Sequence, residues 1–330
     1  MQENKNTLIE EKINEKKEVI HNLILEIHKK VIGQDKLIKN LLVGILSRGH
    51  ILLEGVPGVA KTLTASTLSS SMNLDFKRVQ FTPDLLPSDL IGTEIYNMGK
   101  GDFETKKGPI FTNLLLADEI NRAPSKVQSA LLEAMAEKQV TIGDETFVLD
   151  KPFIVLATQN PIEQAGTYSL PEAELDRFML KVYVDYPSRA DEKKVAKNIL
   201  QIEETKTKKV ISKKELLGLQ DLVKEVYVSD NIIDYVSDII HATRLPEEYG
   251  LENLSKYLKY GVSPRGTISL IFGAKAIAFL AGRAFVIPED IKEIAVETLA
   301  HRLVLTYEAI ADEITGNQII EKIIDSVSVK

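Results

Sequence analysis

The sequence of 330 residues contains no cysteine. The chain can therefore form neither a disulfide framework nor a thiolate metal site, and this composition fits a reducing compartment. Its five histidines are scattered, with no close pair at the spacing of metal ligands. We therefore interpret them as ordinary surface or core residues.

Long apolar runs are also missing. No segment approaches the roughly eighteen consecutive apolar residues that a membrane span requires. The N-terminal sequence MQENKNTLIEEKINEKK is charged and has no apolar stretch of the kind found in signal peptides. We expect no membrane span and predict a cytoplasmic location.

The charges show no basic excess. The chain carries 48 acidic and 41 basic side chains, and its formal net charge is −7. A dedicated nucleic-acid binder usually shows a basic domain or stripe. The densest basic stretch, residues 206–214, has glutamates on both sides and reads as a solvated connection between helices. Nucleic acid is therefore not the expected partner.

What the chain does contain is an alternation of short apolar runs and helical periods between residues 51 and 184. Hydrophobic residues make up 44% of the sequence, enough for a substantial core and two domains. Apolar strands separated by helices predict a parallel sheet covered on both faces. We expect strands at residues 51–54, 76–81, 114–117, 153–158 and 179–184, and helices at residues 61–71, 125–137 and 172–178.

Helical periods dominate both ends of the chain. Residues 8–30 have apolar positions at helical spacing, and strand signals fade after residue 187. In the C-terminal part we predict helices at residues 191–200, 213–226, 231–243, 264–282 and 288–302. The sequence thus predicts an α/β, three-layer αβα domain at residues 1–187 and a smaller all-helical domain at residues 188–330.

Two stretches interrupt the α/β alternation and predict insertions. The first, at about residues 82–107, is rich in proline, glycine and aspartate and has a turn at residues 99–101. The second, at about residues 139–149, is a hairpin signal around Gly143. Neither has the pattern of a core element.

Residues 55–62 (GVPGVAKT) lie between a predicted strand and a predicted helix and are typical of a nucleotide phosphate loop. Gly55 and Gly58 tolerate the dihedrals that aim several N–H groups at one anion. Lys61 would place its charge at the β- and γ-phosphates, and the Thr62 hydroxyl would ligate Mg²⁺ at the start of the helix. The general pattern GxxxxGK[ST] has glycine at the position of Ala60, so the match is incomplete.

Polar residues follow two later strands. Asp118 and Glu119 end the apolar run 114–117, and Asn160 follows the run 153–158. Ligands sit at such strand ends in parallel sheets. Asp118 would hold Mg²⁺, Glu119 would polarise the water that attacks the γ-phosphate, and Asn160 would orient that water. An isolated Asp-Glu pair would be read as a strand cap and Asn-Pro as a turn, but the upstream phosphate loop favours the catalytic interpretation.

Two arginines complete the candidate site. Arg177 comes at the end of a short predicted helix, and Arg265 lies in the first turn of another. Arginine can stabilise the charge that spreads over a transferring phosphoryl group. The alternative for each is a surface salt bridge.

Together these segments resemble the MoxR family of AAA+ ATPases over most of the chain. The family commonly has alanine before the Walker A lysine, so Ala60 supports the resemblance. The matching segments are residues 31–34 (VIGQ, adenine pocket), 55–62 (Walker A), 82–93 (TPDLLPSDLIGT, helix-2 insert), 115–123 (LLADEINRA, Walker B), the hairpin around Gly143, 157–161 (ATQNP, sensor 1), 170–178 (LPEAELDRF, arginine finger) and 263–265 (SPR, sensor 2).

The resemblance implies an AAA+ P-loop domain followed by a helical lid, and ATP or ADP bound with Mg²⁺ between the subunits of a ring, expected to be a hexamer. The implied catalytic residues are Lys61, Glu119, Asn160, Arg177 and Arg265, and the implied metal-binding residues are Thr62 and Asp118. The nucleotide would contact Val31, Ile32, Gly33, Gly55, Pro57, Gly58, Val59, Ala60, Lys61, Thr62, Leu63 and Asp118.

The resemblance also implies how such a ring works. Arg177 would reach the neighbouring subunit's nucleotide, whereas Arg265 could act on its own nucleotide or a neighbour's. Arg122 could face the subunit interface. The two inserts would face the axial opening and act on an unknown client protein, with Tyr96 and Phe103 as contacts or as a packed aromatic pair. The implied partner carries a von Willebrand factor A (VWA) domain.

Three alternatives remain at this stage. Related inserts occur in DNA-associated AAA+ motors, whose turnover would be stimulated by DNA and depend steeply on salt. A magnesium-chelatase-like motor subunit would act with a porphyrin-binding partner. A nucleotide-binding scaffold without hydrolysis is disfavoured by the complete set of candidate catalytic residues.

Overall fold

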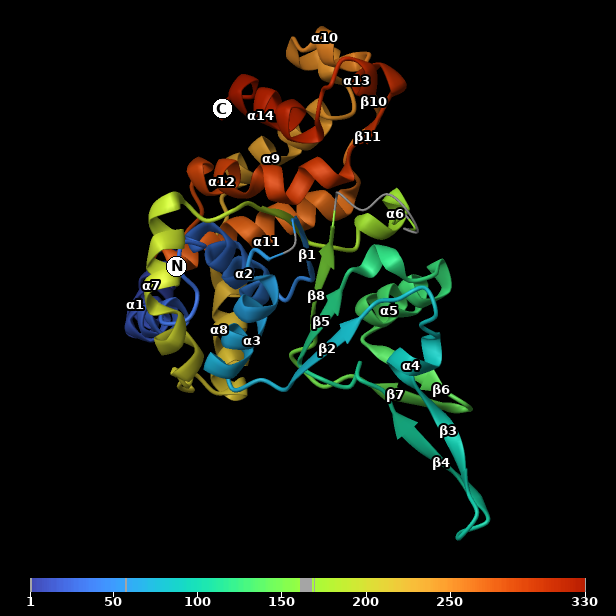
Figure 1. The fold of residues 1–330 in the computed structure, drawn as a ribbon. Helices are drawn as coiled ribbons and strands as arrows, with labels where there is room; N and C mark the ends of the chain where they lie inside the picture. The colour runs from blue at the N-terminus through green and yellow to red at the C-terminus, as the bar shows by residue number, and fades with distance from the viewer. Residues whose placement is uncertain (1, 57, 161–167, 169, 330) are drawn as a thin grey trace.

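Five short apolar segments form one parallel sheet in a computed structural model that describes residues 2–56, 58–160, 168 and 170–329 (Figure 1). The strand order is β2-β5-β8-β1-β9. The bounds are β1 Ile51–Gly55, β2 Phe76–Gln80, β5 Leu114–Asp118, β8 Ile154–Gln159 and β9 Leu180–Val184. The predicted parallel sheet is confirmed, and each strand lies within two residues of its predicted position.

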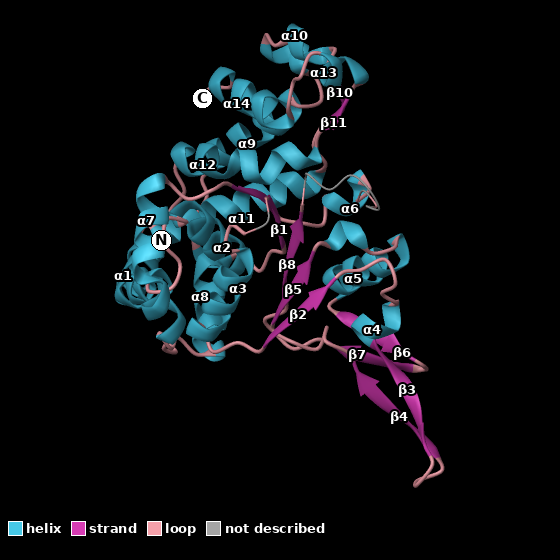
Figure 2. Cartoon of the chain, in the orientation of Figure 1, coloured by secondary structure: helices cyan, strands magenta, loops and turns pink. Residues whose placement is uncertain are grey.

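Side chains of β5 divide between two hydrophobic clusters on the two faces of the sheet. Leu114 and Leu116 belong to one cluster, whereas Leu115 and Ala117 belong to the other. This alternation is the two-residue period of a strand buried on both faces. Helices cover both faces (Figure 2), so the predicted three-layer arrangement is confirmed.

The first cluster includes residues of α1 (Gln2–His28), α2 (Asp35–Leu46) and α3 (Lys61–Ser71). The second includes residues of α5 (Ser125–Glu137). The helix α2 had no counterpart in the sequence-based prediction. Nine of its twelve residues are buried, and a helix buried on most sides has no clear apolar stripe.

Both predicted inserts contain antiparallel hairpins. The first includes α4 (Pro87–Ile91), β3 (Gly92–Asn97) and β4 (Asp102–Lys107), and its hairpin projects away from the rest of the molecule (Figure 1). The second consists of β6 (Gln139–Ile142) and β7 (Glu145–Val148). Neither pair belongs to the central sheet.

The C-terminal part, predicted to be all-helical, is mainly helical but contains one short antiparallel ribbon between β10 (Leu258–Tyr260) and β11 (Val304–Leu305). It follows the short helix α6 (Glu172–Leu175) and β9. Its helices are α7 Arg189–Glu204, α8 Lys213–Glu225, α9 Asp230–Ala242, α10 Glu252–Ser255, α11 Pro264–Leu280, α12 Pro288–Leu299, α13 Tyr307–Ala311 and α14 Gly316–Ser326, with 3₁₀ turns η1 Ile120–Arg122, η2 Pro246–Tyr249 and η3 Ala300–Arg302.

The helical part shares apolar core with the N-terminal helices. Gln220 on α8 donates a hydrogen bond of 2.7 Å from Nε2 to the carbonyl of Ile45 on α2, and both helices contribute to the first cluster. The division at residue 188 therefore stays a prediction. Within the described residues, no helix is both long and apolar enough to cross a membrane.

Candidate active site

The loop after β1 has the backbone that its sequence suggested. A Cβ on Gly55 would lie 2.3 Å from the carbonyl oxygen of Val184, so the close approach of β1 and β9 requires glycine here. Gly58 has φ +87°. Ala60, the N-cap of α3, is left-handed with φ 60° and ψ 20°, a conformation that costs a non-glycine residue about 1–2 kcal/mol. Pro57 lies outside the described residues.

A cavity of about 410 Å³ opens at the carboxyl ends of β1, β5 and β8. Nine predicted site residues line it, together with two residues that were not predicted, Arg78 and Thr158. The predicted ones are Gly58, Val59, Ala60, Lys61, Thr62, Leu63, Asp118, Glu119 and Asn160. Gly55 and the proposed adenine-pocket residues Val31, Ile32 and Gly33 are not among its lining residues.

Lys61 lies at the centre of the candidate phosphate site. Its ammonium donates a hydrogen bond of 2.7 Å to the carbonyl of Gly55. Burial lowers the pKa of Lys61, while the nearby carboxylates of Asp118, Glu119 and Glu54 favour its charged form. A half-buried cation with acidic neighbours suits a bound polyanion with its metal ion.

Asp118 is held on both carboxylate oxygens. The Thr158 hydroxyl donates a hydrogen bond of 2.6 Å to Oδ1, and Nη2 of Arg78 lies 2.6 Å from Oδ2. The same Thr158 oxygen accepts a bond of 2.8 Å from the backbone N–H of Glu119. Thr158, on the neighbouring strand β8, therefore fixes the position of both acidic residues.

Glu119 directly follows β5 and has a left-handed backbone conformation, with φ 55°. Its Oε2 accepts hydrogen bonds from Gln80 Nε2 at 2.8 Å and from Arg122 Nη1 at 2.9 Å. Arg122 thus contacts the candidate base of its own subunit. Its expected position at the subunit interface stays a prediction. The sequence analysis missed Gln80 and Arg78, although two polar residues at alternate positions of the edge strand β2 were a usable signal.

The cavity residues fit a bound Mg²⁺. Asp118 supplies a carboxylate and Thr62 a hydroxyl to the same cavity. No cluster of three or more histidine or acidic side chains suited to a metal exists within the described residues. Magnesium needs no such cluster beside a nucleotide, because it uses one or two carboxylates, substrate phosphates and water.

Arg177 and Arg265 line a different cavity, of about 330 Å³, which also contains Arg48 and Arg302. It includes His50 and Met179, the residues directly before β1 and β9. It therefore lies at the amino ends of β1 and β9, whereas the phosphate loop follows the carboxyl end of β1. Arg177 donates from Nη1 to the carbonyl of Leu132 at 2.9 Å, and no carboxylate in the described part of the chain pairs with it.

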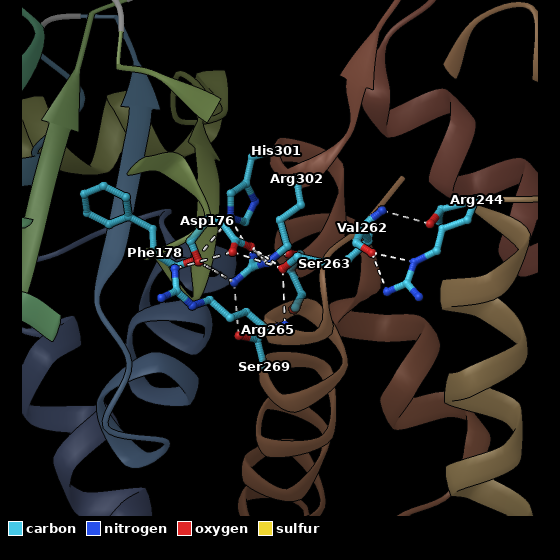
Figure 3. A network of polar contacts seen from close by, with 11 residues as sticks. Asp176, Phe178, Arg244, Val262, Ser263, Arg265, Ser269, His301 and Arg302 are labelled. Atoms are coloured by element: carbon cyan, nitrogen blue, oxygen red, sulfur yellow. Dashed lines mark hydrogen bonds and ion pairs between the residues drawn. The ribbon is translucent and has the colours of Figure 1, made fainter. Parts of the chain in front are cut away.

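Asp176 joins this second cavity to the helical part (Figure 3). Its carboxylate accepts bonds from the Ser263 hydroxyl at 2.9 and 3.0 Å. It also pairs with Arg302 Nε at 3.0 Å and with Arg265 Nη1 at 3.6 Å. Burial lowers the pKa of Arg302 to about 10. Burial and the adjacent Arg302 charge hold the pKa of His301 well below its ordinary value.

Comparison with known proteins agrees with this geometry. Residues 50–180 match the ATPase family associated with various cellular activities (AAA), and residues 252–323 match the AAA lid domain. Chaperone MoxR1 of Mycobacterium tuberculosis is 46% identical over 94% of this chain and 82% of its own length. The uncharacterized protein YeaC of Bacillus subtilis is 44% identical over 92% of each chain.

Two further relatives extend the comparison. Protein MoxR of Paracoccus denitrificans is 32% identical over 84% of this chain and 86% of its own. The crystal structure of an ATPase candidate from Cytophaga hutchinsonii is 52% identical, covers 97% of this chain and 98% of that chain, and superposes with a TM-score of 0.92. The chain therefore belongs to the MoxR family of AAA+ ATPases and is an ATP-hydrolysing enzyme.

Proposed function

We propose that each subunit binds ATP with Mg²⁺ at its phosphate loop and that the next subunit in a ring completes the catalytic site. Lys61 and the loop N–H groups hold the phosphates, and Thr62 and Asp118 hold the metal. Bound Mg²⁺ neutralises charge on the phosphates. The common cavity of these residues supports this assignment.

Glu119 is the proposed base that polarises the attacking water, and Asn160 orients that water. Both line the cavity beside Lys61. The hydrogen bonds from Gln80 and Arg122 hold the Glu119 carboxylate in one orientation. Both bonds end on Oε2, so we assign Oε1 to the attacking water.

The observation that carries the proposal is the separation of the two cavities. The arginines lie at the amino ends of β1 and β9, whereas the phosphate loop lies at the carboxyl end of β1. A strand of five residues spans about 16 Å, more than an arginine side chain reaches. This separation supports our proposal that Arg177 and Arg265 act on the phosphates of a neighbouring subunit, and we assign both a role in trans.

The remaining assignments rest on the family relationship. We propose that Val31, Ile32 and Gly33 line the adenine side, with Gly55 and Pro57 in the loop, and that the ring is a cytoplasmic hexamer. Val31 and Val59 are both buried, and the place of Val31 beside the base rests on the family relationship. Residues 188–330 would form the lid.

We further propose that hydrolysis drives chaperone-like remodelling of a client protein with a VWA-domain partner. A relative at 46% identity carries the name Chaperone MoxR1. The β3–β4 hairpin offers exposed apolar side chains, with Tyr96 52%, Phe103 62% and Met98 92% exposed. Tyr96 and Phe103 also pack edge to face, with ring centroids 5.3 Å apart, and both rings stay exposed, which supports the proposal that they contact the client.

A mixed-ring experiment tests the shared site. Arg177→Ala subunits should bind ATP but not hydrolyse it, and Lys61→Ala subunits should fail to bind ATP. Mixing the two should restore part of the activity, because some interfaces then combine an intact loop with an intact arginine. Assembled mixed rings without any recovery would contradict a finger acting in trans.

The client role needs a separate test. Capture with the hydrolysis-deficient Glu119→Gln protein should retain a client in the presence of ATP. Replacing Tyr96 and Phe103 by serine in that protein should abolish capture without changing ATP binding. Retained capture by the hairpin variant would remove the hairpin from the proposal.

A further inference from the structure

Asp176 is adjacent in sequence to Arg177 and also contacts the segment that carries Arg265. Its two carboxylate oxygens share the hydroxyl hydrogen of Ser263, the N-cap of α11, in a bifurcated bond. The same Ser263 oxygen accepts the backbone N–H of Arg265 at 3.2 Å. The Asp176 carboxylate thus links the two segments that carry Arg177 and Arg265, the arginines that we assign to the neighbour's nucleotide.

Arg302 is buried and pairs with Asp176. Its side chain is 1% exposed, and that of Asp176 is 16% exposed. Besides its 3.0 Å pairing with Asp176, Arg302 donates to the carbonyl of Thr298 at 2.6 Å, to the carbonyl of Phe178 at 2.9 Å and to the Ser269 hydroxyl at 3.1 Å. These contacts join η3, α11, α12 and the segment before β9, and Figure 3 shows Arg302 with Asp176, Phe178 and Ser269.

The contacts leave little freedom to the groups that they hold. A buried guanidinium is costly without a partner, so Arg302 and Asp176 must stay together while the lid is docked. The planar guanidinium donates in fixed directions, and its bonds to Ser269 and to the Phe178 carbonyl fix the distance between α11 and the segment of Arg177. Nothing in the phosphate-loop cavity takes part in these contacts.

We infer that Asp176 and Arg302 are positioning residues that hold Arg177 and Arg265 as one unit facing the neighbouring subunit's nucleotide. This inference rests on the proposed function. A displacement of either arginine by about 1 Å would lower the rate by up to a hundredfold. A change in lid position would then act on the neighbour's hydrolysis through α11 and Asp176.

Asp176→Asn tests the inference because it preserves shape and removes the charge. We expect kcat of assembled rings to fall by about tenfold to a hundredfold, with KM and the ATP affinity of the subunit's own site unchanged. Mixing with Lys61→Ala subunits should restore part of the rate, as for Arg177→Ala.

Controls separate positioning from folding. Asp312 accepts from Lys256 and Tyr257 away from both cavities, so Asp312→Asn should keep the wild-type kcat. If Asp176→Asn is unstable, Asp176→Asn combined with Arg302→Gln removes both charges and should regain stability without regaining rate. Ser263→Ala leaves the ion pair intact but removes the bond to Asp176 and the N-cap bond from the Arg265 N–H, so it should still lower kcat, by about threefold or more.

The outcomes distinguish the two proposals. A wild-type kcat per folded molecule in Asp176→Asn and Ser263→Ala, with only a lower melting temperature, would overturn the positioning role. Full activity of Arg177→Ala would instead overturn the proposed trans site. If Arg177→Ala is inactive and Asp176→Asn is fully active, the positioning inference is wrong while the proposed trans site stands.

Discussion

Arg78 and Asp118 form an ion pair across the edge of the sheet, with 2.6 Å between Nη2 and Oδ2. The two residues come from neighbouring strands, β2 and β5. The pair occupies one oxygen of the carboxylate that we assign to Mg²⁺. Arg78 and the metal ion therefore compete for Asp118.

Removing Arg78 should lower the Mg²⁺ requirement. In Arg78→Met the half-saturating Mg²⁺ concentration for ATP hydrolysis should fall by up to about fivefold, since a solvent-exposed pair contributes about 0.2–1 kcal/mol. A magnesium titration at saturating ATP measures this change, with Arg78→Lys as the charge-preserving control. An unchanged or higher requirement in Arg78→Met would contradict the competition.

Glu119→Gln should separate nucleotide binding from hydrolysis. The amide cannot accept a proton from water, so we expect kcat to fall by about 10²–10⁴-fold while ATP still binds. Phosphate release and nucleotide binding on the same preparation measure the two effects. Glu308→Gln, at an exposed position of the lid, is the matched control. Wild-type turnover in Glu119→Gln would show that another group acts as the base.

Because of Lys138, the free energy of unfolding should increase as the pH rises from about 8 to about 10. Burial lowers the pKa of Lys138 to about 8, below its value in the unfolded chain, where it is about 10.4. The unfolded state therefore binds more protons between these two values. The cost of burying the ammonium is fully present below pH 8 and disappears as the pH rises toward 10.

Lys138→Met should remove that cost. Its Nζ lies 5.7 Å from the ring centre of Phe153 and contacts Nε2 of His50. Since that nitrogen also has the Met135 carbonyl as a partner, methionine can pack on Phe153 without leaving His50 unpaired. We expect the free energy of unfolding to rise by about 1 kcal/mol at pH 7 and the gain to shrink by pH 9.5, as measured in urea. Lys126→Met, at an exposed site of α5, should show no such pH dependence. A gain that is the same at both pH values would refute this account.

Two glycines of the phosphate loop should respond differently to alanine. In Gly55→Ala the new Cβ would meet the Val184 carbonyl at 2.3 Å, and β1 and β9 would have to separate, at a cost of about 3 kcal/mol or more. In Gly58→Ala nothing lies within 4 Å of the new Cβ, so only the left-handed backbone costs about 1–2 kcal/mol. Thermal unfolding of both variants measures the difference, and equal losses would disprove it.

Local patterns predicted the central elements well. The bounds of α3 and α5 match the predicted ranges 61–71 and 125–137, because each helix directly follows a strand and a loop with clear signals. The helix α6 ends at Leu175 rather than residue 178. Asp176 and Arg177 instead bond to Ser263 and the Leu132 carbonyl, contacts that a local pattern does not contain.

The sequence by itself determined the chemistry of the phosphate loop and of the acidic strand end, because a strand, a turn and a helix start are local features. It also determined the family. Only the tertiary structure decided that Arg177 and Arg265 lie at the amino ends of the strands, whereas Lys61 lies at their carboxyl ends. Parallel strand direction fixes that separation. Arg302 lies 126 residues from Asp176 in sequence, and only folding brings the two charges together.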